Sequence, residues 1–301
     1  MSQPFITRIV AVILILIASS SMASLAAGQE PRPAPPSQNS QEEQKPEQPS
    51  VGPSNPKPPT FIQSFSQDEW RMWTSPFRRS TYGSKTVRKY GIPFLLISAA
   101  AIATDPWTGD LLPNTTEQTK WSGRVSQLGA AYTLAGISGA TYLLGRVKGN
   151  EHFKETGFLG LQAIAHTQIF VFALKQATNR ERPATHEKHP TFWRGGNSFP
   201  SGHAATSFAV ATVFAYEYRH HIAVPITAYT LATAVAASRL SAQRHWVSDI
   251  FVGSSMGFLI GRYVYKNHHN PDLPGSPVSR ASRLIPEFGV SSRGIVCIWN
   301  L

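Results

Sequence analysis

The feature that most constrains the fold is a series of apolar segments that recur along the chain beyond Phe61. The segments are rich in Ala, Leu, Ile, Gly and Thr, and only Pro93 and Pro225 lie in them, both near segment starts. Because proline is tolerated in the first turn of a helix, the pattern predicts helices. The segments are 91–104, 129–145, 156–174, 204–218, 222–238 and 250–265. We therefore expect an all-α fold, a bundle of about six helices.

The same segments suggest a membrane. Their small residues suit closely packed membrane helices. A full span needs about 20 mostly apolar residues, whereas several segments are shorter and the third contains Gln162, His166 and Gln168. We expect a membrane-embedded bundle, with a soluble bundle as the alternative.

The first 60 residues have a different composition. Arg8, the apolar stretch 9–18 and the small residues 24–26 are typical of a signal peptide, which we assign to residues 1–27. An uncleaved anchor helix is the alternative. Residues 28–60 are polar and rich in proline, so we expect a disordered linker there. A helical domain at 61–266 follows, and the tail 267–301 has no assigned role.

The charge of the chain limits its partners. The 301 residues include 28 Lys and Arg against 17 Asp and Glu, a formal net charge of +11. Such an excess suits an anionic membrane surface or a phosphorylated substrate. No nucleic-acid-binding motif accompanies the charge, so we expect no nucleic-acid partner. The single cysteine, Cys297, excludes an intramolecular disulfide and a cysteine-cluster metal site.

The first chemical motif is "NSFPSGHAAT" (197–206), directly before an apolar segment. The start of a helix has unpaired N–H groups and a positive dipole end, and it binds phosphate readily. Ser201 can cap the helix, Gly202 lets a ligand approach the backbone, and His203 can exchange a proton. An ordinary capped helix with an incidental histidine is the alternative.

A second motif, "ASRLSAQRHWVSDIFVG", places His245 four residues before Asp249. On a helix these positions share a face, so the carboxylate can hold one ring nitrogen and leave the other as a nucleophile. A surface ion pair is the alternative. The third motif, "LKQATNRERPAT", contains Lys175 and Arg182, with Arg180 adding positive charge. Its cations can bind phosphate oxygens, or form a basic loop at a membrane surface.

Taken together, the three motifs indicate a family. Lys-x6-Arg-Pro, Pro-Ser-Gly-His and Ser-Arg-x5-His-x3-Asp occur in that order, each beside an apolar segment. This arrangement resembles the type 2 phosphatidic acid phosphatase (PAP2) superfamily, in its membrane-associated bacterial branch. The superfamily also includes non-specific acid phosphatases and vanadium haloperoxidases. The resemblance covers about 156–265.

The resemblance implies a role for each motif residue. His245 would attack phosphorus and form a phosphohistidine, with Asp249 orienting its ring. His203 would protonate the leaving oxygen and then assist water. The phosphoryl group would be held by Lys175, Arg182, Ser201, Gly202 and Arg239. We expect no metal or cofactor, because the cations take the place of a metal, and we interpret His186 and His189 as loop residues.

The expected function is hydrolysis of a phosphomonoester or diphosphate, most plausibly of a lipid or polyprenyl phosphate. A soluble periplasmic acid phosphatase acting on small phosphate esters is the alternative, followed by a vanadium haloperoxidase. The expected partners are the phosphorylated substrate and the membrane. We place the protein in a bacterial inner membrane with its active site facing the periplasm.

Topology follows from three basic stretches, at 146–154, 219–221 and 266–269. By the positive-inside tendency they face the cytoplasm, which puts the three motifs on the opposite side. An exported N-terminus then requires that segment 91–104 does not cross fully. Its shortness and the following Asp105 favour an interfacial or re-entrant helix.

Overall fold

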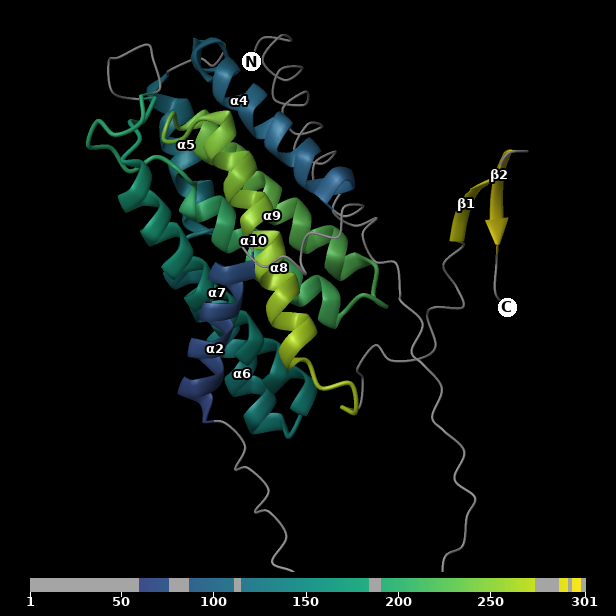
Figure 1. Cartoon of the computed structure of the whole chain (residues 1–301). Helices are drawn as coiled ribbons and strands as arrows, with labels where there is room; N and C mark the ends of the chain where they lie inside the picture. The colour runs from purple at the N-terminus through teal and green to yellow at the C-terminus, as the bar shows by residue number, and fades with distance from the viewer. Residues whose placement is uncertain are drawn as a thin grey trace, which may run out of the picture. The chain divides into compact units, whose positions relative to one another are not determined.

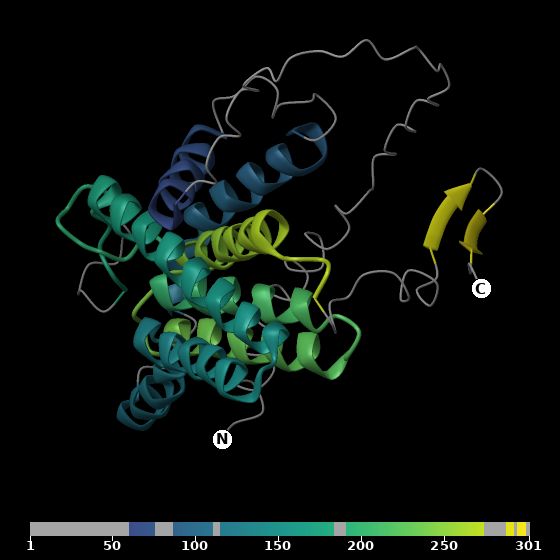
Figure 2. The ribbon, with the colours of Figure 1, turned by 90° about the horizontal axis from the view of Figure 1, so that it is seen from below.

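A computed structural model describes residues 60–75, 87–110, 115–183, 191–273, 287–291 and 294–298. The helices are α2 (Phe61–Thr74), the π-helical turn η3 (Val87–Gly91), α4 (Ile92–Asp110), α5 (Thr116–Gln127), α6 (Ala131–Lys148), α7 (Glu151–Thr178), α8 (Gly202–Glu217), α9 (Ala223–Ser241) and α10 (Val247–His268). Two strands, β1 (Glu287–Ser291) and β2 (Gly294–Ile298), follow in the tail and pair antiparallel. Helices α4 to α10 pack as a bundle (Figures 1 and 2).

The all-α prediction is confirmed for the bundle, and each predicted segment is a helix. Five of the six segments match α6 to α10 with ends that differ by a few residues. The segment at 91–104 differs most, because α4 continues through Pro106 to Asp110. The sequence analysis did not identify α5, which is polar rather than apolar. It also did not identify the hairpin of the tail, and the signal peptide and linker lie outside the described residues.

The close approach of α8 and α10 sets the geometry of the bundle. Gly253, Gly257 and Gly261 recur every four residues on α10 and so share one face. A Cβ at Gly257 would lie 2.0 Å from the backbone oxygen of Ala205, and one at Gly261 would lie 2.4 Å from that of Ala209. Only glycine therefore allows the two helices to approach this closely. The contact aligns the start of α8 with the start of α10.

Helix α5 joins the bundle through hydrogen bonds to the end of α9. Gln118 Nε2 donates to the backbone oxygen of Ser241 at 2.8 Å, and Ser122 Oγ donates to Ser241 Oγ at 2.9 Å. Ser126 lies one turn further along α5 and accepts a hydrogen bond from Arg239. A polar helix is thus fixed by specific pairs, which an apolar periodicity does not reveal.

The bundle exposes many large apolar side chains. The apolar window of the stretch Val87–Thr108 is only 6% buried, and that of α7 is 50% buried. Both are long and apolar enough to cross a membrane, a test that the core helix of a soluble protein also passes. Further exposed residues lie on α6, α7, α9 and α10: Leu143, Leu144, Phe158, Phe172, Ile226, Leu231 and Leu259.

The chain divides into two units, of which the bundle from Pro93 onward belongs to one. Helix α2 belongs to the other. It begins with a capping box, in which the Thr60 side chain accepts from the Gln63 backbone while the Gln63 side chain accepts from the Thr60 backbone. No helix was predicted at these residues, and the domain predicted at 61–266 includes both α2 and the bundle.

Candidate active site

The three motifs meet at one end of the bundle. Lys175 lies in the last turn of α7, Ser201 is the N-cap of α8, and Arg239 lies in the last turn of α9. The loop from α9 to α10 carries His245, and the first turn of α10 carries Asp249. Successive helices run in alternating directions, so residues from distant positions in the sequence meet at the same end of the bundle.

His245 is held in one orientation by a backbone group. Its Nδ1 lies 2.8 Å from the carbonyl oxygen of Ser198, and the side chain is 2% exposed. A carbonyl oxygen only accepts hydrogen bonds, so Nδ1 carries the proton. The second nitrogen, Nε2, therefore keeps its lone pair, which is the state that a nucleophilic histidine needs.

Asp249 acts on His245 less directly than the sequence suggested. Its Oδ2 lies 3.6 Å from His245 Nδ1, which is beyond hydrogen-bond distance. The same oxygen accepts from Ser198 Oγ at 2.5 Å and from the Trp246 backbone at 2.9 Å. The proximity predicted from the i, i+4 spacing is confirmed, but the ring proton goes to the Ser198 carbonyl. Asp249 thus fixes Ser198, and Ser198 fixes the histidine.

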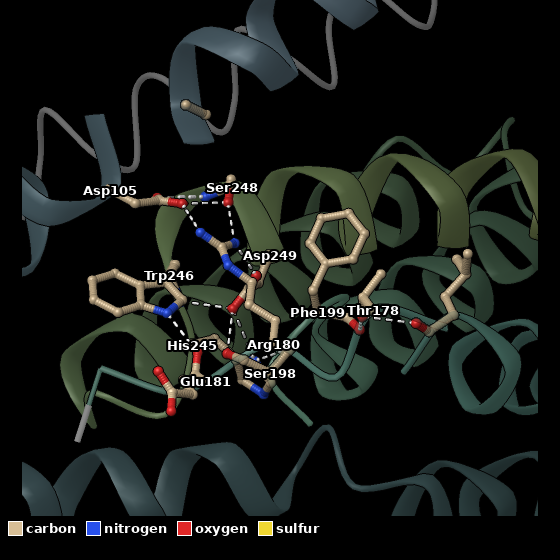
Figure 3. Close-up of polar contacts among 12 residues, drawn as sticks. Asp105, Thr178, Arg180, Glu181, Ser198, Phe199, His245, Trp246, Ser248 and Asp249 are labelled. Atoms are coloured by element: carbon tan, nitrogen blue, oxygen red, sulfur yellow. Dashed lines mark hydrogen bonds and ion pairs between the residues drawn. The ribbon is translucent and has the colours of Figure 1, made fainter. Parts of the chain in front are cut away.

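A buried arginine anchors this carboxylate. Arg180 is 0% exposed, and its guanidinium donates to Asp249 Oδ1 and to Asp105 Oδ2, both at 2.6 Å (Figure 3). Ser248 Oγ accepts from Arg180 at 2.7 Å and donates to Asp105. One cation between two buried carboxylates costs desolvation, which these charge-assisted bonds offset. Asp105 thereby ties the end of α4 to the start of α10.

One of the remaining cations, Arg239, has a buried donor available for an anion. Arg239 donates from Nη1 to Ser126 Oγ at 3.0 Å, while its buried Nε has no hydrogen-bond partner among the described residues. Arg182 donates from Nε to Asn197 Oδ1 at 2.9 Å. Buried donors left without a partner are costly, and a phosphate oxygen is the type of acceptor they suit.

The start of α8 fits part of the predicted phosphate cradle. The Ser201 hydroxyl does not cap the helix, is buried, and has no partner within the described part of the chain. Its backbone N–H donates to the backbone oxygen of Asp249 at 3.0 Å and is therefore already used. Of the two Ser201 donors, the hydroxyl is therefore the one without a hydrogen bond to another described residue. A Cβ at Gly202 would meet only Val171, at 3.3 Å, so the approach to its N–H is open.

Burial and neighbouring cations keep His245 neutral near pH 7. Burial lowers the pKa of His245 to about 4, although Asp249 acts in the opposite direction. Arg239 and Lys175 add to the lowering of this pKa, because a nearby positive charge disfavours a protonated ring.

Three residues of this site were not predicted from the sequence. Arg180 appeared only as additional positive charge, and Asp105 only as the residue after a short apolar segment. Ser198 had no assigned role, although it lies three residues before the N-cap residue Ser201. Arg180 and Asp105 could have been noticed because each charged residue follows an apolar segment. A charge that becomes buried in such a place needs a partner of opposite charge. Nothing in the sequence paired one with the other.

Comparison with known families agrees with this geometry. Residues 158–272 match the model of the PAP2 superfamily. This region of the chain is similar to that superfamily. The match includes all three motifs and the helices α8 to α10 in full.

Two curated proteins resemble part of the chain. The lipid A 1-phosphatase of Porphyromonas gingivalis is 43% identical over 70 residues, which are 23% of this chain and 16% of that protein. The probable diacylglycerol pyrophosphate phosphatase 1 of Schizosaccharomyces pombe is 33% identical over 97 residues, 26% of this chain and 35% of that protein. The chain thus spans about a third or less of the length of these relatives.

Two solved structures resemble the bundle. LpxE of Aquifex aeolicus has a TM-score of 0.39 at 23% identity, over 51% of this chain and 88% of that chain. The PAP2-type phosphatidylglycerolphosphate phosphatase of Bacillus subtilis has a TM-score of 0.45 at 24% identity, over 58% of this chain and 92% of that chain. Both TM-scores are low, so neither structure supports a conclusion about substrate.

Proposed function

We propose that the chain is a membrane phosphatase that hydrolyses a lipid phosphate or diphosphate through a phosphohistidine. The observation that carries the proposal is the state of His245. Its Nδ1 proton is held by the Ser198 carbonyl, so Nε2 is a nucleophile, and the charges of Arg239 and Lys175 act on the same ring. A nucleophile beside cations is the arrangement that phosphoryl transfer needs.

The reaction would proceed in two steps. His245 Nε2 forms a bond to phosphorus while the bond from phosphorus to the alcohol or phosphate oxygen breaks, and His203 gives that oxygen a proton. Water then attacks the phosphohistidine, His203 takes a proton from it, and the bond from phosphorus to Nε2 breaks. Phosphate leaves and His245 returns to its first state. Arg182, Arg239, Lys175 and the Ser201 hydroxyl stabilise the phosphoryl oxygens in both steps.

The network behind His245 would stabilise the intermediate. Phosphorylation at Nε2 leaves positive charge on the ring, because Nδ1 keeps its proton. Asp249 lies 3.6 Å away and carries a negative charge held by Arg180, so the charged ring is favoured over the neutral one. Asp249 and Arg180 are thus positioning residues, and neither touches the substrate.

The exposed apolar surface supports a lipid substrate over a small soluble ester. Apolar side chains such as Leu95 and Phe172, 66% exposed on different helices, would face water in a soluble bundle. Monomeric soluble proteins seldom expose a large apolar area of this kind. A bilayer covers such side chains, and it also contains the substrate. We therefore propose that α4 and α6 to α10 are embedded in the membrane.

We further propose that the motif end faces the periplasm and that α4 crosses completely. Asp105, near the end of α4, bonds to Arg180 and so lies at the motif end. The stretch before α4 contains Arg78, Arg79, Lys85, Arg88 and Lys89, which favours the cytoplasm for its beginning. This crossing would leave residues 28–60 in the cytoplasm, contrary to a cleaved export signal.

Substrate assays test the function. The full chain, purified in detergent, is assayed for phosphate release from phosphatidic acid, a polyprenyl diphosphate and 4-nitrophenyl phosphate. We expect the lipids to have the highest kcat/KM, and His245→Asn to be inactive on all three. Release of the protein from membranes by salt alone, together with equal kcat/KM for the small ester, would support the soluble phosphatase instead.

Cysteine labelling tests the topology. In a Cys297→Ser background, single cysteines are introduced at Glu69, at Lys188 and at His221, and a membrane-impermeant maleimide is applied to intact cells. We expect label only at position 188. Label at both 69 and 188 would instead support an exported N-terminus. Label at 221 would show that the orientation is the reverse of the one proposed.

A further inference from the structure

A second buried polar cluster lies at the end of α7 opposite the active site. Glu155 comes from the first turns of α7, Glu217 from the last turn of α8, and His269 directly follows α10. One ligand atom from each lies within 4.8 Å of the others. Glu217 is 1% exposed, and the side chains of Glu155 and His269 are 11% and 9% exposed. Two carboxylates and an imidazole therefore share one small, mostly buried space.

The distances suit a bound divalent ion. His269 Nδ1 lies 3.2 Å from Glu217 Oε1 and 3.6 Å from Glu155 Oε2. A tetrahedral metal with bonds of about 2.0–2.1 Å holds its ligand atoms roughly 3.4 Å apart. The two distances from His269 are thus close to those that a single ion would impose, and the two carboxylate oxygens lie within 4.8 Å of each other.

The second oxygen of each carboxylate is fixed from outside the cluster. Glu217 Oε2 lies 2.8 Å from His152 Nε2, and the backbone N–H of Asn270 donates to Glu155 Oε1. The ring of His269 is stacked on Tyr265 at 4.5 Å and 16°. Outer groups of this kind orient metal ligands and leave one oxygen of each carboxylate directed at the ion.

Without an ion the cluster leaves one acceptor without a hydrogen bond. His269 Nδ1 can donate its one proton to Glu217, at 3.2 Å, while Glu155 lies beyond hydrogen-bond distance. Glu155 Oε2 is buried and has no hydrogen-bond partner among the described residues. A buried carboxylate oxygen without a donor is costly, and a cation removes that cost.

We infer that Glu155, Glu217 and His269 form a structural site for a divalent transition-metal ion, with Zn²⁺ as the best match to one imidazole and two carboxylates. The site clamps the start of α7 to the ends of α8 and α10. It does not take part in phosphoryl transfer, because Lys175 lies 20 residues further along α7, about 30 Å away at 1.5 Å per residue. The inference is independent of the proposed function.

Metal binding by the purified full chain tests the inference. The protein is stripped with a chelator, dialysed against Zn²⁺, and its metal content is measured by mass spectrometry. Binding of Co²⁺ is followed by its visible absorption. We expect one equivalent of Zn²⁺, intense tetrahedral Co²⁺ bands, and a rise of about 5–10 °C in Tm when Zn²⁺ exceeds its Kd about 100-fold.

Variants separate the site from incidental binding. Glu155→Gln keeps the acceptor for Asn270 but removes the charge, and it should lose the metal, the bands and the rise in Tm. Glu217→Gln should do the same, and Glu155→Gln remains informative if Glu217→Gln does not fold. Glu151→Gln and His221→Gln, at exposed positions near the site, should behave as wild type. Absence of stoichiometric uptake by the wild type, or equal uptake by Glu155→Gln and Glu151→Gln, would overturn the inference.

Discussion

The two ends of α7 carry buried polar clusters that differ in the kind of atom left without a partner. At the motif end the unpaired atoms are donors, Arg239 Nε and the Ser201 hydroxyl, and cations surround them. At the opposite end the unpaired atom is an acceptor, Glu155 Oε2, and a second carboxylate is close to it. The first end therefore suits an anion and the second suits a cation.

The comparison shows that histidine and a carboxylate alone do not define a site. Each end contains a buried His–carboxylate pair, His245 with Asp249 and His152 with Glu217. At the motif end Arg180 neutralises the carboxylate and the ring keeps a free Nε2. At the other end Glu217 is paired with two imidazoles, those of His152 and His269. The surrounding charge thus decides between chemistry and ligation.

The largest expected difference between the ends concerns turnover. His245→Asn removes the nucleophile and should lower kcat by at least about 10⁴-fold on every substrate. Glu155→Gln, at the other end, should change kcat less than about twofold, since it lies about 30 Å away. Phosphate release measured in the same detergent checks both variants. A large loss of kcat in folded Glu155→Gln would show that the two ends are coupled.

The second prediction concerns the general acid. His203→Gln should lower kcat by about 10² to 10⁴-fold on a lipid or alkyl phosphate, because the departing alkoxide needs a proton. The loss should be clearly smaller on 4-nitrophenyl phosphate, because nitrophenolate leaves without help.

Rapid-quench labelling with radiolabelled substrate checks the role of His203 from a second direction. Label should accumulate on the protein in His203→Gln with the activated ester and be absent in His245→Asn. His221→Gln is the matched control and should leave both substrates unaffected. Equal losses on the two substrates would assign the proton transfer to another group.

The third prediction contrasts anion and chelator. Vanadate mimics the transition state of phosphoryl transfer. The concentration of vanadate needed for half-inhibition should therefore be lower than that of phosphate by a factor of about 10² or more. A chelator should lower Tm without changing kcat at temperatures where the protein stays folded. Activity that vanishes with the chelator and returns with a divalent ion would place a metal in the reaction and contradict the proposed mechanism.

The smallest expected effect is the pH dependence. Attack needs neutral His245, and burial lowers the pKa of this residue to about 4, which extends the neutral form to lower pH. After correction for ionisation of the substrate, kcat/KM should fall less than about twofold from pH 7 to pH 5. With a histidine of the ordinary pKa of about 6.5, kcat/KM would fall roughly 25-fold over the same range. An acid limb centred near 6.5 would show that the ring is more solvated than described.

The apolar pattern was sufficient to predict the helices of the bundle, because burial of an apolar face imposes a helical period on the sequence. It did not reveal α5, since that helix is fixed by pairs such as Gln118 with Ser241, which impose no period. The end of α4 was also misplaced. Proline and aspartate usually mark a boundary, but Asp105 lies inside this helix and its charge is paired.

The sequence by itself determined which residues are proposed for the chemistry, because three ordered motifs point to His203, His245, Asp249 and the cations without any coordinates. Only the tertiary structure decided how they are connected. The Ser198 carbonyl holds the ring proton, and Arg180 joins Asp249 to Asp105 across 69 and 75 positions. The cluster of Glu155, Glu217 and His269 likewise exists only after folding, since these residues are separated by 52 positions or more. Hydrogen bonds and ion pairs depend on distances of a few ångströms, and the order of residues along a chain does not encode such distances between remote segments.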